Sequence, residues 1–139
     1  MEFFGFRRPD GSVGTRNHVV ILPGGYVADN ICALVRGTST IRRANPGMDA
    51  TPRDKETVAR TLVGIGQNPN AAAVIVHTGG LISDHPEFDA YRLAEQIAAT
   101  GKPVEVLDVI KAGGTLEAVV QGAKLAAFLV RDASRLRRE

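Results

Sequence analysis

The chain has 139 residues, of which 44% are hydrophobic and 23% charged, with a formal net charge of +2 and a sequence pI of about 9.0. This length and composition are typical of a globular protein with one domain and a real core. No apolar run approaches the ~20 residues that span a bilayer, no cleavable leader opens the chain, and the single cysteine excludes an internal disulfide framework. We therefore expect a cytoplasmic protein that does not enter a membrane. Because its basic residues are not interleaved with aromatic ones, we expect no nucleic-acid binding.

The first segment predicts a β-hairpin over residues 3–17. Pro9, Asp10 and Gly11 together favour a tight turn, because each residue type suits one corner of it. Arg16 and Asn17 follow, just before an apolar run. A guanidinium and an amide suit the recognition of a carboxylate, although an arginine at the start of a strand is also an ordinary structural residue.

Four short apolar runs at 19–22, 38–41, 72–76 and 104–107 alternate with segments of helical period. The runs are continuous rather than alternating, which is typical of strands covered on both faces. We expect helices over 28–35, 52–67, 84–99 and 115–137. The pattern predicts a three-layer α/β fold with a mainly parallel four-stranded sheet, helices on both of its faces, and the N-terminal hairpin. We expect these elements to form one domain, with an α/β body that spans residues 18–137.

Two of these helices carry a start signal. Thr51 offers an N-cap hydroxyl, Pro52 suits the first helical position, and Asp54 completes a capping box. Residues 84–87 repeat the pattern for the third helix, which we expect to bury Phe88, either Tyr91 or Leu93, and the apolar residues at 94 and 97.

Glycine-rich loops follow three of the four predicted strands. Ligands of open α/β sheets bind beyond the carboxyl ends of the strands, where loops and helix N-termini are free. Paired glycines let an anion approach the backbone, although each pair alone also fits a tight turn. The residues expected to line a shared substrate pocket are Gly24, Gly25, Thr78, Gly79, Gly80, Lys111, Gly113, Gly114 and Thr115.

His77 is the candidate catalytic residue, because it ends the third predicted strand beside these loops. A neutral imidazole there can serve as acid, base or metal ligand, and it can equally be a histidine hydrogen-bonded to a neighbouring loop. The chain lacks the glycine motifs of dinucleotide and Walker-type nucleotide sites. It shows no nucleophile-elbow context either.

Several segments together resemble the second domain of the D-galactarate dehydratase/altronate hydrolase family. They are Phe-Gly-Phe-Arg-Arg-Pro-Asp-Gly at 4–11 with Val-Gly-Thr-Arg-Asn at 13–17, Arg-Thr-Leu at 60–62 with Asn-Pro-Asn-Ala at 68–71, Gly-Lys-Pro-Val at 101–104, and Gly-Gly-Thr at 113–115. These pieces cover nearly the whole chain in the family's order.

The resemblance implies a sugar-acid dehydratase, a hydro-lyase that eliminates water from a hexarate or aldonate such as galactarate or altronate to give a 2-keto-3-deoxy acid. It also implies a divalent metal, typically iron, and a C-terminal catalytic domain or partner subunit. The chain is then a fragment or subunit that is inactive alone. The chain lacks the cysteine-containing segments of the family. In their places it has Pro-Gly-Gly at 23–25, Asn-Pro-Gly at 45–47 and His-Thr-Gly-Gly at 77–80. We therefore expect no complete set of metal ligands within the chain.

Our leading hypothesis is that Arg16, Asn17, His77, Lys111 and residues 113–115 form one wall of an active site completed elsewhere. Lys111 would pair with a substrate carboxylate as a point charge. Two alternatives remain: a non-catalytic module that binds a small anion, and an assembly domain whose basic C-terminal helix docks on another subunit. Assembly of the chain with itself also stays open.

Overall fold

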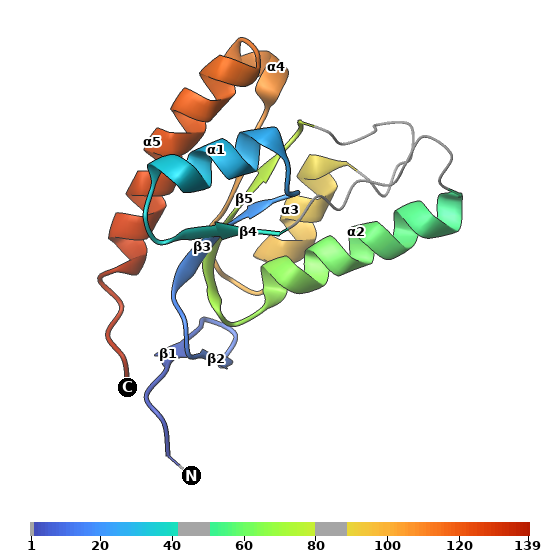
Figure 1. Ribbon diagram of the computed structural model, residues 1–139. Helices are drawn as coiled ribbons and strands as arrows, with labels where there is room; N and C mark the ends of the chain where they lie inside the picture. The colour runs from blue at the N-terminus through green and yellow to red at the C-terminus, as the bar shows by residue number, and fades with distance from the viewer. Residues whose placement is uncertain (1, 42–50, 80–88) are drawn as a thin grey trace.

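The computed structural model describes residues 2–41, 51–79 and 89–139 (Figure 1). The elements in chain order are β1 (Phe6–Arg7), β2 (Val13–Gly14), β3 (His18–Leu22), α1 (Tyr26–Leu34), β4 (Thr38–Thr40), α2 (Pro52–Gln67), β5 (Ala71–His77), α3 (Ala90–Ala98), β6 (Val104–Leu107), α4 (Val109–Ala112) and α5 (Thr115–Ala133). β1 and β2 form an antiparallel hairpin, and the other strands form a parallel sheet in the order β4-β3-β5-β6. The predicted α/β class, parallel sheet and N-terminal hairpin are confirmed.

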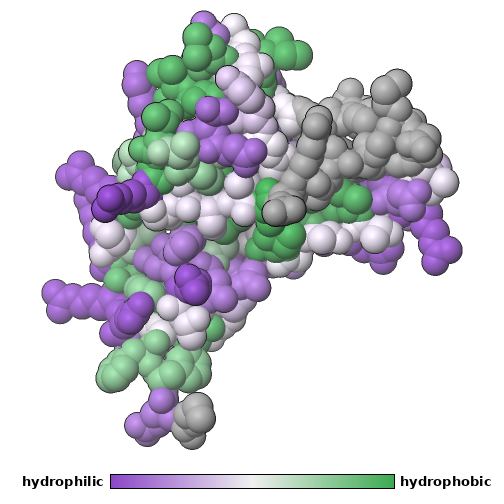
Figure 2. Space-filling view, in the orientation of Figure 1, coloured by the Kyte–Doolittle hydropathy of each residue, from purple (hydrophilic) through white to green (hydrophobic). Residues whose placement is uncertain are grey.

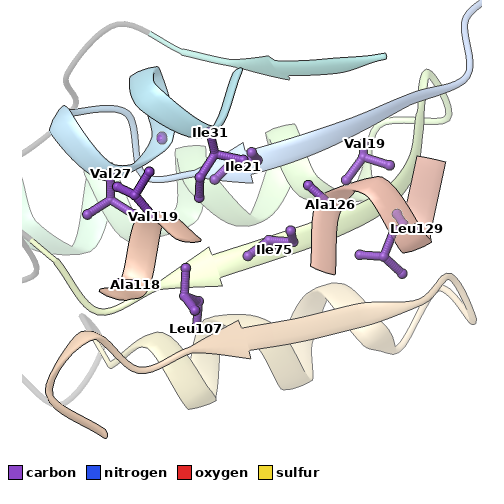
Figure 3. Close-up of a cluster of buried hydrophobic side chains, with 12 residues drawn as sticks. Val19, Ile21, Val27, Ile31, Ile75, Leu107, Ala118, Val119, Ala126 and Leu129 are labelled. Atoms are coloured by element: carbon purple, nitrogen blue, oxygen red, sulfur yellow. The ribbon is translucent and has the colours of Figure 1, made fainter. Parts of the chain in front are cut away.

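Helices cover both faces of the sheet, as its unbroken apolar runs predicted (Figure 1). On one face, α1 and α5 pack around a core that includes Val19, Ile21 and Ile75 (Figure 3). On the other face, α2 and α3 pack around a second core that includes Leu22 and Val74. All seven residues of the central strand β5 are buried, which explains why its sequence shows no polar alternation.

One of the two predicted helix starts is confirmed, and the other cannot be compared with the described residues. The Thr51 capping box of α2 is confirmed: the Thr51 hydroxyl accepts the Asp54 N–H at 3.2 Å, and the Asp54 carboxylate accepts the Thr51 N–H at 2.9 Å. Helix α3 begins at Ala90, where the Asp89 carboxylate caps it by accepting the Tyr91 N–H at 2.7 Å. The start predicted at 84–87, like Phe88, lies outside the described residues. Of the two candidates for burial, Leu93 is buried and Tyr91 is exposed.

The structure of α1, α4 and α5 also differs from the sequence prediction. Helix α1 begins at Tyr26 rather than at 28, and α5 ends at Ala133 rather than at 137. The four-residue helix α4 was not predicted, because so short a segment shows no helical period. No helix within the described ranges is long and apolar enough to cross a membrane.

The hairpin lies at the amino end of the sheet, which is the end where β3, β5 and β6 begin (Figure 1). Gly14 passes against the turn before β5, so closely that a side chain there would collide with the Pro69 carbonyl. Gly5 and Glu139 exchange two backbone hydrogen bonds of 3.0 and 2.9 Å. The first and last segments of the chain therefore lie together at this end.

Arg8 joins the hairpin to the sheet through a buried guanidinium. Only 4% of this residue is exposed. Its Nε donates to the Pro69 carbonyl at 2.7 Å, Nη1 donates to Asn17 Oδ1 at 2.8 Å, and Nη2 donates to the Arg16 carbonyl at 2.8 Å. A buried cation is tolerated when its donors meet acceptors, and the planar fork of arginine meets three of them here.

We expect Arg8→Ala to lower the free energy of unfolding by at least about 3 kcal/mol, because it removes three hydrogen bonds from a charged donor, each worth about 1.5–3 kcal/mol. Arg8→Lys should restore only part of this, since an ammonium cannot reproduce the fork. Urea unfolding measures both variants. Arg7→Ala is the matched control: its exposed pair with Glu139, at 3.3 Å, should contribute about 0–1 kcal/mol. Equal losses from the two alanine variants would contradict the role assigned to Arg8.

Two glycines of α2 allow a second test within one helix. A Cβ at Gly66 would lie 2.5 Å from Ile97 Cδ1 in the core, whereas nothing lies within 4 Å of a Cβ at Gly64. Gly66→Ala should therefore destabilise the protein by about 1–3 kcal/mol through overpacking. Gly64→Ala should stabilise it by about 0.5–1 kcal/mol, the helix-propensity difference. Thermal and urea unfolding measure both, and a shift of the same sign in the two variants would refute this packing.

Candidate functional site

Three loops meet at the carboxyl end of the sheet, where β3, β5 and β6 end side by side. His77 Nε2 lies 2.5 Å from the Pro23 carbonyl oxygen, which links the β5 loop to the β3 loop. The Thr78 N–H donates to the Leu107 carbonyl at 3.0 Å, and the Thr78 hydroxyl accepts the Val109 N–H at 2.8 Å. These contacts bring Gly24, Gly25, Thr78 and Gly79 to the same end as α4 and the start of α5. Gly80 lies outside the described residues.

His77 is buried beneath these loops, with 1% of the residue exposed. The Pro23 carbonyl can only accept, so Nε2 carries the hydrogen and Nδ1 carries a lone pair. Nδ1 is buried and has no hydrogen-bond partner among the described residues. Burial lowers the pKa of His77, and the hydrogen bond to Pro23 opposes this shift. The side chain is therefore a neutral imidazole with an unused acceptor.

Gly79 leaves space beside this acceptor. A Cβ at position 79 would lie 3.2 Å from His77 Nδ1, 3.4 Å from a Val109 methyl carbon and 3.5 Å from a Val27 methyl carbon. The glycine thus lies where the loops after all three strands meet. A side chain there would crowd the unused nitrogen.

The helices α1 and α5 begin at this end without side-chain caps. Their N-cap residues, Gly25 and Gly114, have φ angles of 138° and 120° that favour glycine, and neither makes a side-chain capping bond. In contrast, threonine or aspartate side chains cap α2, α3 and α4. The first turns of α1 and α5 pack in one core, with Val27 and Val119 in the same cluster (Figure 3). Among the described residues, no N-cap side chain binds the first N–H groups of either helix, and each first turn carries an acidic residue, Asp29 in α1 and Glu117 in α5.

Lys111 is not a free point charge. Its Nζ donates to the Tyr91 hydroxyl at 3.1 Å, and that hydroxyl donates to Asp108 Oδ2 at 2.9 Å. The backbone N–H of Lys111 and then the Tyr91 hydroxyl lower the pKa of Asp108, while the Tyr91 hydroxyl raises the pKa of Lys111. Sequence reasoning missed this trio, because Tyr91 precedes Lys111 by 20 residues. Gly113 ends α4 in the left-handed region, next to Gly114 and Thr115.

Arg16 and Asn17 lie at the amino end of the sheet, and the structure does not bring them to the glycine-rich loops. They immediately precede β3, whereas the loops follow β3, β5 and β6, so the length of the strands separates the two groups. The Asn17 amide is fully engaged: Oδ1 accepts from Arg8 at 2.8 Å and Nδ2 donates to the Ala133 carbonyl at 2.7 Å. The expectation that this pair shares one wall with the loops is wrong for this reason.

Lys102, which sequence reasoning did not single out, is a second buried cation at the amino end. Only 4% of it is exposed, and its Nζ donates to the carbonyls of Gly66 and Asn68 at 2.9 and 2.8 Å. These carbonyls belong to the C-terminal end of α2, where a cation is favoured. Burial, and then the charge of Arg8, lowers the pKa of Lys102 to about 8.

Within the described ranges, no three His, Cys, Asp or Glu side chains lie close enough together to hold a metal ion. His77 alone contributes one nitrogen at the carboxyl end. The described residues therefore do not fit the iron that the family resemblance implies, and no step of the chemistry below passes through it.

Comparison with known proteins agrees with the resemblance in the sequence. The family model for the D-galactarate dehydratase/altronate hydrolase second domain matches residues 5–134. The chain is also similar to the (2R)-sulfolactate sulfo-lyase subunit beta of Chromohalobacter salexigens, at 36% identity over 141 residues that cover 99% of this chain and 34% of that subunit. The chain thus spans about a third of the length of this curated relative. No solved structure matches it.

The lowered pKa of Lys102 predicts a stability that rises with pH. Between the pKa of about 8 in the folded chain and the ordinary 10.5 of the unfolded chain, the unfolded state holds a proton that the folded state has released. Stability therefore increases through this window, by up to about 1.4 kcal/mol per pH unit from this group. Urea unfolding from pH 7 to 10 should show the wild type gaining on Lys102→Met. The exposed control Lys124→Met should follow the wild type, and parallel curves for wild type and Lys102→Met would contradict the assignment.

Proposed function

Because the chain belongs to the D-galactarate dehydratase/altronate hydrolase family, we propose that it supplies one wall of a lyase active site at the carboxyl end of its sheet. The observation that carries this proposal is the unused, buried Nδ1 of neutral His77, at the same end of the sheet as two helix N-termini without side-chain caps. An imidazole acceptor next to anion-binding N–H groups suits the removal of a proton near a carboxylate.

The proposed reaction is an elimination from a 2-hydroxycarboxylate that bears a leaving group on C3. A base removes the proton from C2, the bond between C3 and the leaving group breaks with its electron pair, and the enol product becomes a 2-keto acid. When hydroxide leaves, galactarate or altronate gives a 2-keto-3-deoxy acid. When sulfite leaves, the same steps describe a sulfo-lyase, the activity for which the relative is named.

In this proposal His77 Nδ1 accepts the proton. The Nε2–H group, donating to Pro23, fixes the tautomer and stabilises the imidazolium that forms, as the third group does in other base-orienting arrangements. The first helical N–H groups of α1 and α5, which follow the N-cap residues Gly25 and Gly114, hold the substrate carboxylate. Lys111 carries its positive charge at this end of the sheet as part of a group with Tyr91 and Asp108, and not as an isolated charge.

The rest of the site is proposed to come from a further domain or a partner subunit. The relative is itself named as a subunit, and about two thirds of it lies outside the match. Large apolar side chains lie exposed beside the carboxyl end, where Ile110 is 89% and Leu116 70% exposed. Figure 2 shows hydrophobic surface around α4 and the start of α5. Such a surface favours cover by another part of the protein, which also provides the place for the family's divalent metal.

The test is a lyase assay of this chain alone and of the chain joined to its continuation or partner subunit. Galactarate, altronate and (2R)-sulfolactate are offered, and 2-keto acid is measured. We expect turnover from the complete protein only. In that protein His77→Gln, whose amide retains a donor toward Pro23 but lacks Nδ1, should lower kcat by about 10²–10⁴-fold. Its melting temperature and circular dichroism should stay near those of the wild type.

The pH profile gives a second readout of the same role. A base with a lowered pKa works when neutral, so kcat/KM should fall with acid through a midpoint below the ordinary histidine value of 6.5 and be level above it. Full activity in a folded His77→Gln protein would remove His77 from the chemistry. The chain would then be the non-catalytic anion-binding or assembly domain of its complex.

A further inference from the structure

A pocket of about 240 Å³ lies at the amino end of the sheet, at the opposite end of the strands from His77. Val20, Ile65 and Ala71 form its apolar lining, and they belong to the core between the sheet and α2. Drug-sized ligands occupy pockets of roughly 300–1,000 Å³, so this volume suits a smaller molecule. Nothing in the lyase proposal uses this pocket.

The polar part of the lining offers free hydrogen-bond donors, because the oxygen atoms of the same side-chain amides are already used as acceptors. Asn70 Oδ1 accepts the backbone N–H groups of Thr15 and Arg16 at 2.9 and 3.1 Å, and Asn68 Oδ1 accepts the Asn70 N–H at 2.9 Å. No described residue accepts a hydrogen bond from the side-chain amide nitrogens of Asn68 and Asn70 or from the Arg16 guanidinium. Ser39 adds a hydroxyl to the same lining.

Arg16 is held in place by its backbone while its side chain stays uncommitted. Its N–H donates to Asn70, and its carbonyl accepts from Arg8 at 2.8 Å. The peptide groups on both sides of the Arg16 Cα are thus fixed at the pocket. A guanidinium on a fixed backbone suits recognition of a carboxylate, sulfonate or phosphate group.

The charges around this pocket favour an anion. None of the described lining residues is acidic. The end of α2 would normally give the region a negative potential through its free carbonyls. Lys102 and Arg8 occupy those of Gly66, Asn68 and Pro69, so two buried cations lie directly behind the rim.

We propose that this amino-end pocket binds a small organic anion, with the charged group on Arg16 and the amides of Asn68 and Asn70, and the carbon body against Val20 and Ile65. The ligand is a short carboxylate, sulfonate or phosphate ester. This site is separate from the carboxyl-end site and does not depend on a lyase activity.

Nuclear magnetic resonance titration of the ¹⁵N-labelled chain tests the proposal with malate, sulfate and phosphate, each at constant ionic strength set with sodium chloride. We expect saturable shifts of the backbone amides of Arg16, His18 and Ser39 and of the Asn70 side-chain amide. Malate should bind more tightly than the inorganic ions, because only malate fills the apolar part. Arg16→Gln should weaken malate binding about tenfold or more, the loss of a charged hydrogen bond.

Arg92→Gln on α3 is the matched control, since Arg92 is also exposed but lies outside the pocket lining. It should bind malate as the wild type does. Equal weakening by the two variants, non-saturating shifts, or shifts confined to Tyr26 and Thr115 at the carboxyl end would each overturn the pocket as an anion site. Sulfate or phosphate binding as tightly as malate would overturn the organic nature of the ligand. If the amide resonances at the pocket do not shift with any of the three ions, but shift when an acidic peptide from a further part of the protein is added, the pocket is a docking site and not an anion site.

Discussion

The buried guanidinium of Arg8 is the interaction on which the rest of the structure depends. Its hydrogen bonds connect residues 9 and 61 positions away in the chain, so the hairpin, the start of β3 and the turn before β5 are held by one side chain. Lys102 likewise holds the end of α2 in place by donating to the carbonyls of Gly66 and Asn68. At this end the two cations bind the backbone carbonyls of residues 16, 66, 68 and 69. The carboxyl end is then free to carry loops and open helix ends.

Most of the sequence that resembles the family lies at this amino end. Segments 4–17, 68–71 and 101–104 contain Arg8, the carbonyls that it binds and Lys102. Segment 113–115 alone among the conspicuous motifs lies at the carboxyl end. The resemblance therefore rests mainly on residues that hold the fold, which is why it identifies the family more firmly than it identifies the chemistry.

The sequence predicted the elements whose signals are local. Continuous apolar runs located the strands, and the capping box located the start of α2, because burial and capping depend on neighbouring residues. The Asp89 cap of α3 was not predicted, and the start predicted at 84–87 lies outside the described residues. The roles of Arg8 and Lys102, and the Tyr91–Lys111 contact, depend on partners 20 to 61 residues away. The error over Arg16 had another cause: residues before a strand lie at the end opposite to the loop that follows it.

The two ends of the sheet differ in how their polar groups are satisfied. At the amino end, Arg8 donates three hydrogen bonds and Lys102 donates two, mostly to backbone carbonyls. At the carboxyl end, a neutral histidine keeps an unused nitrogen, and Gly25 and Gly114 leave helix N–H groups open. Unused buried polar groups cost stability, so a fold retains them where a ligand or another part of the protein satisfies them. Ile110 and Leu116 lie exposed beside this end, as the proposed completion of the site by another domain or subunit requires.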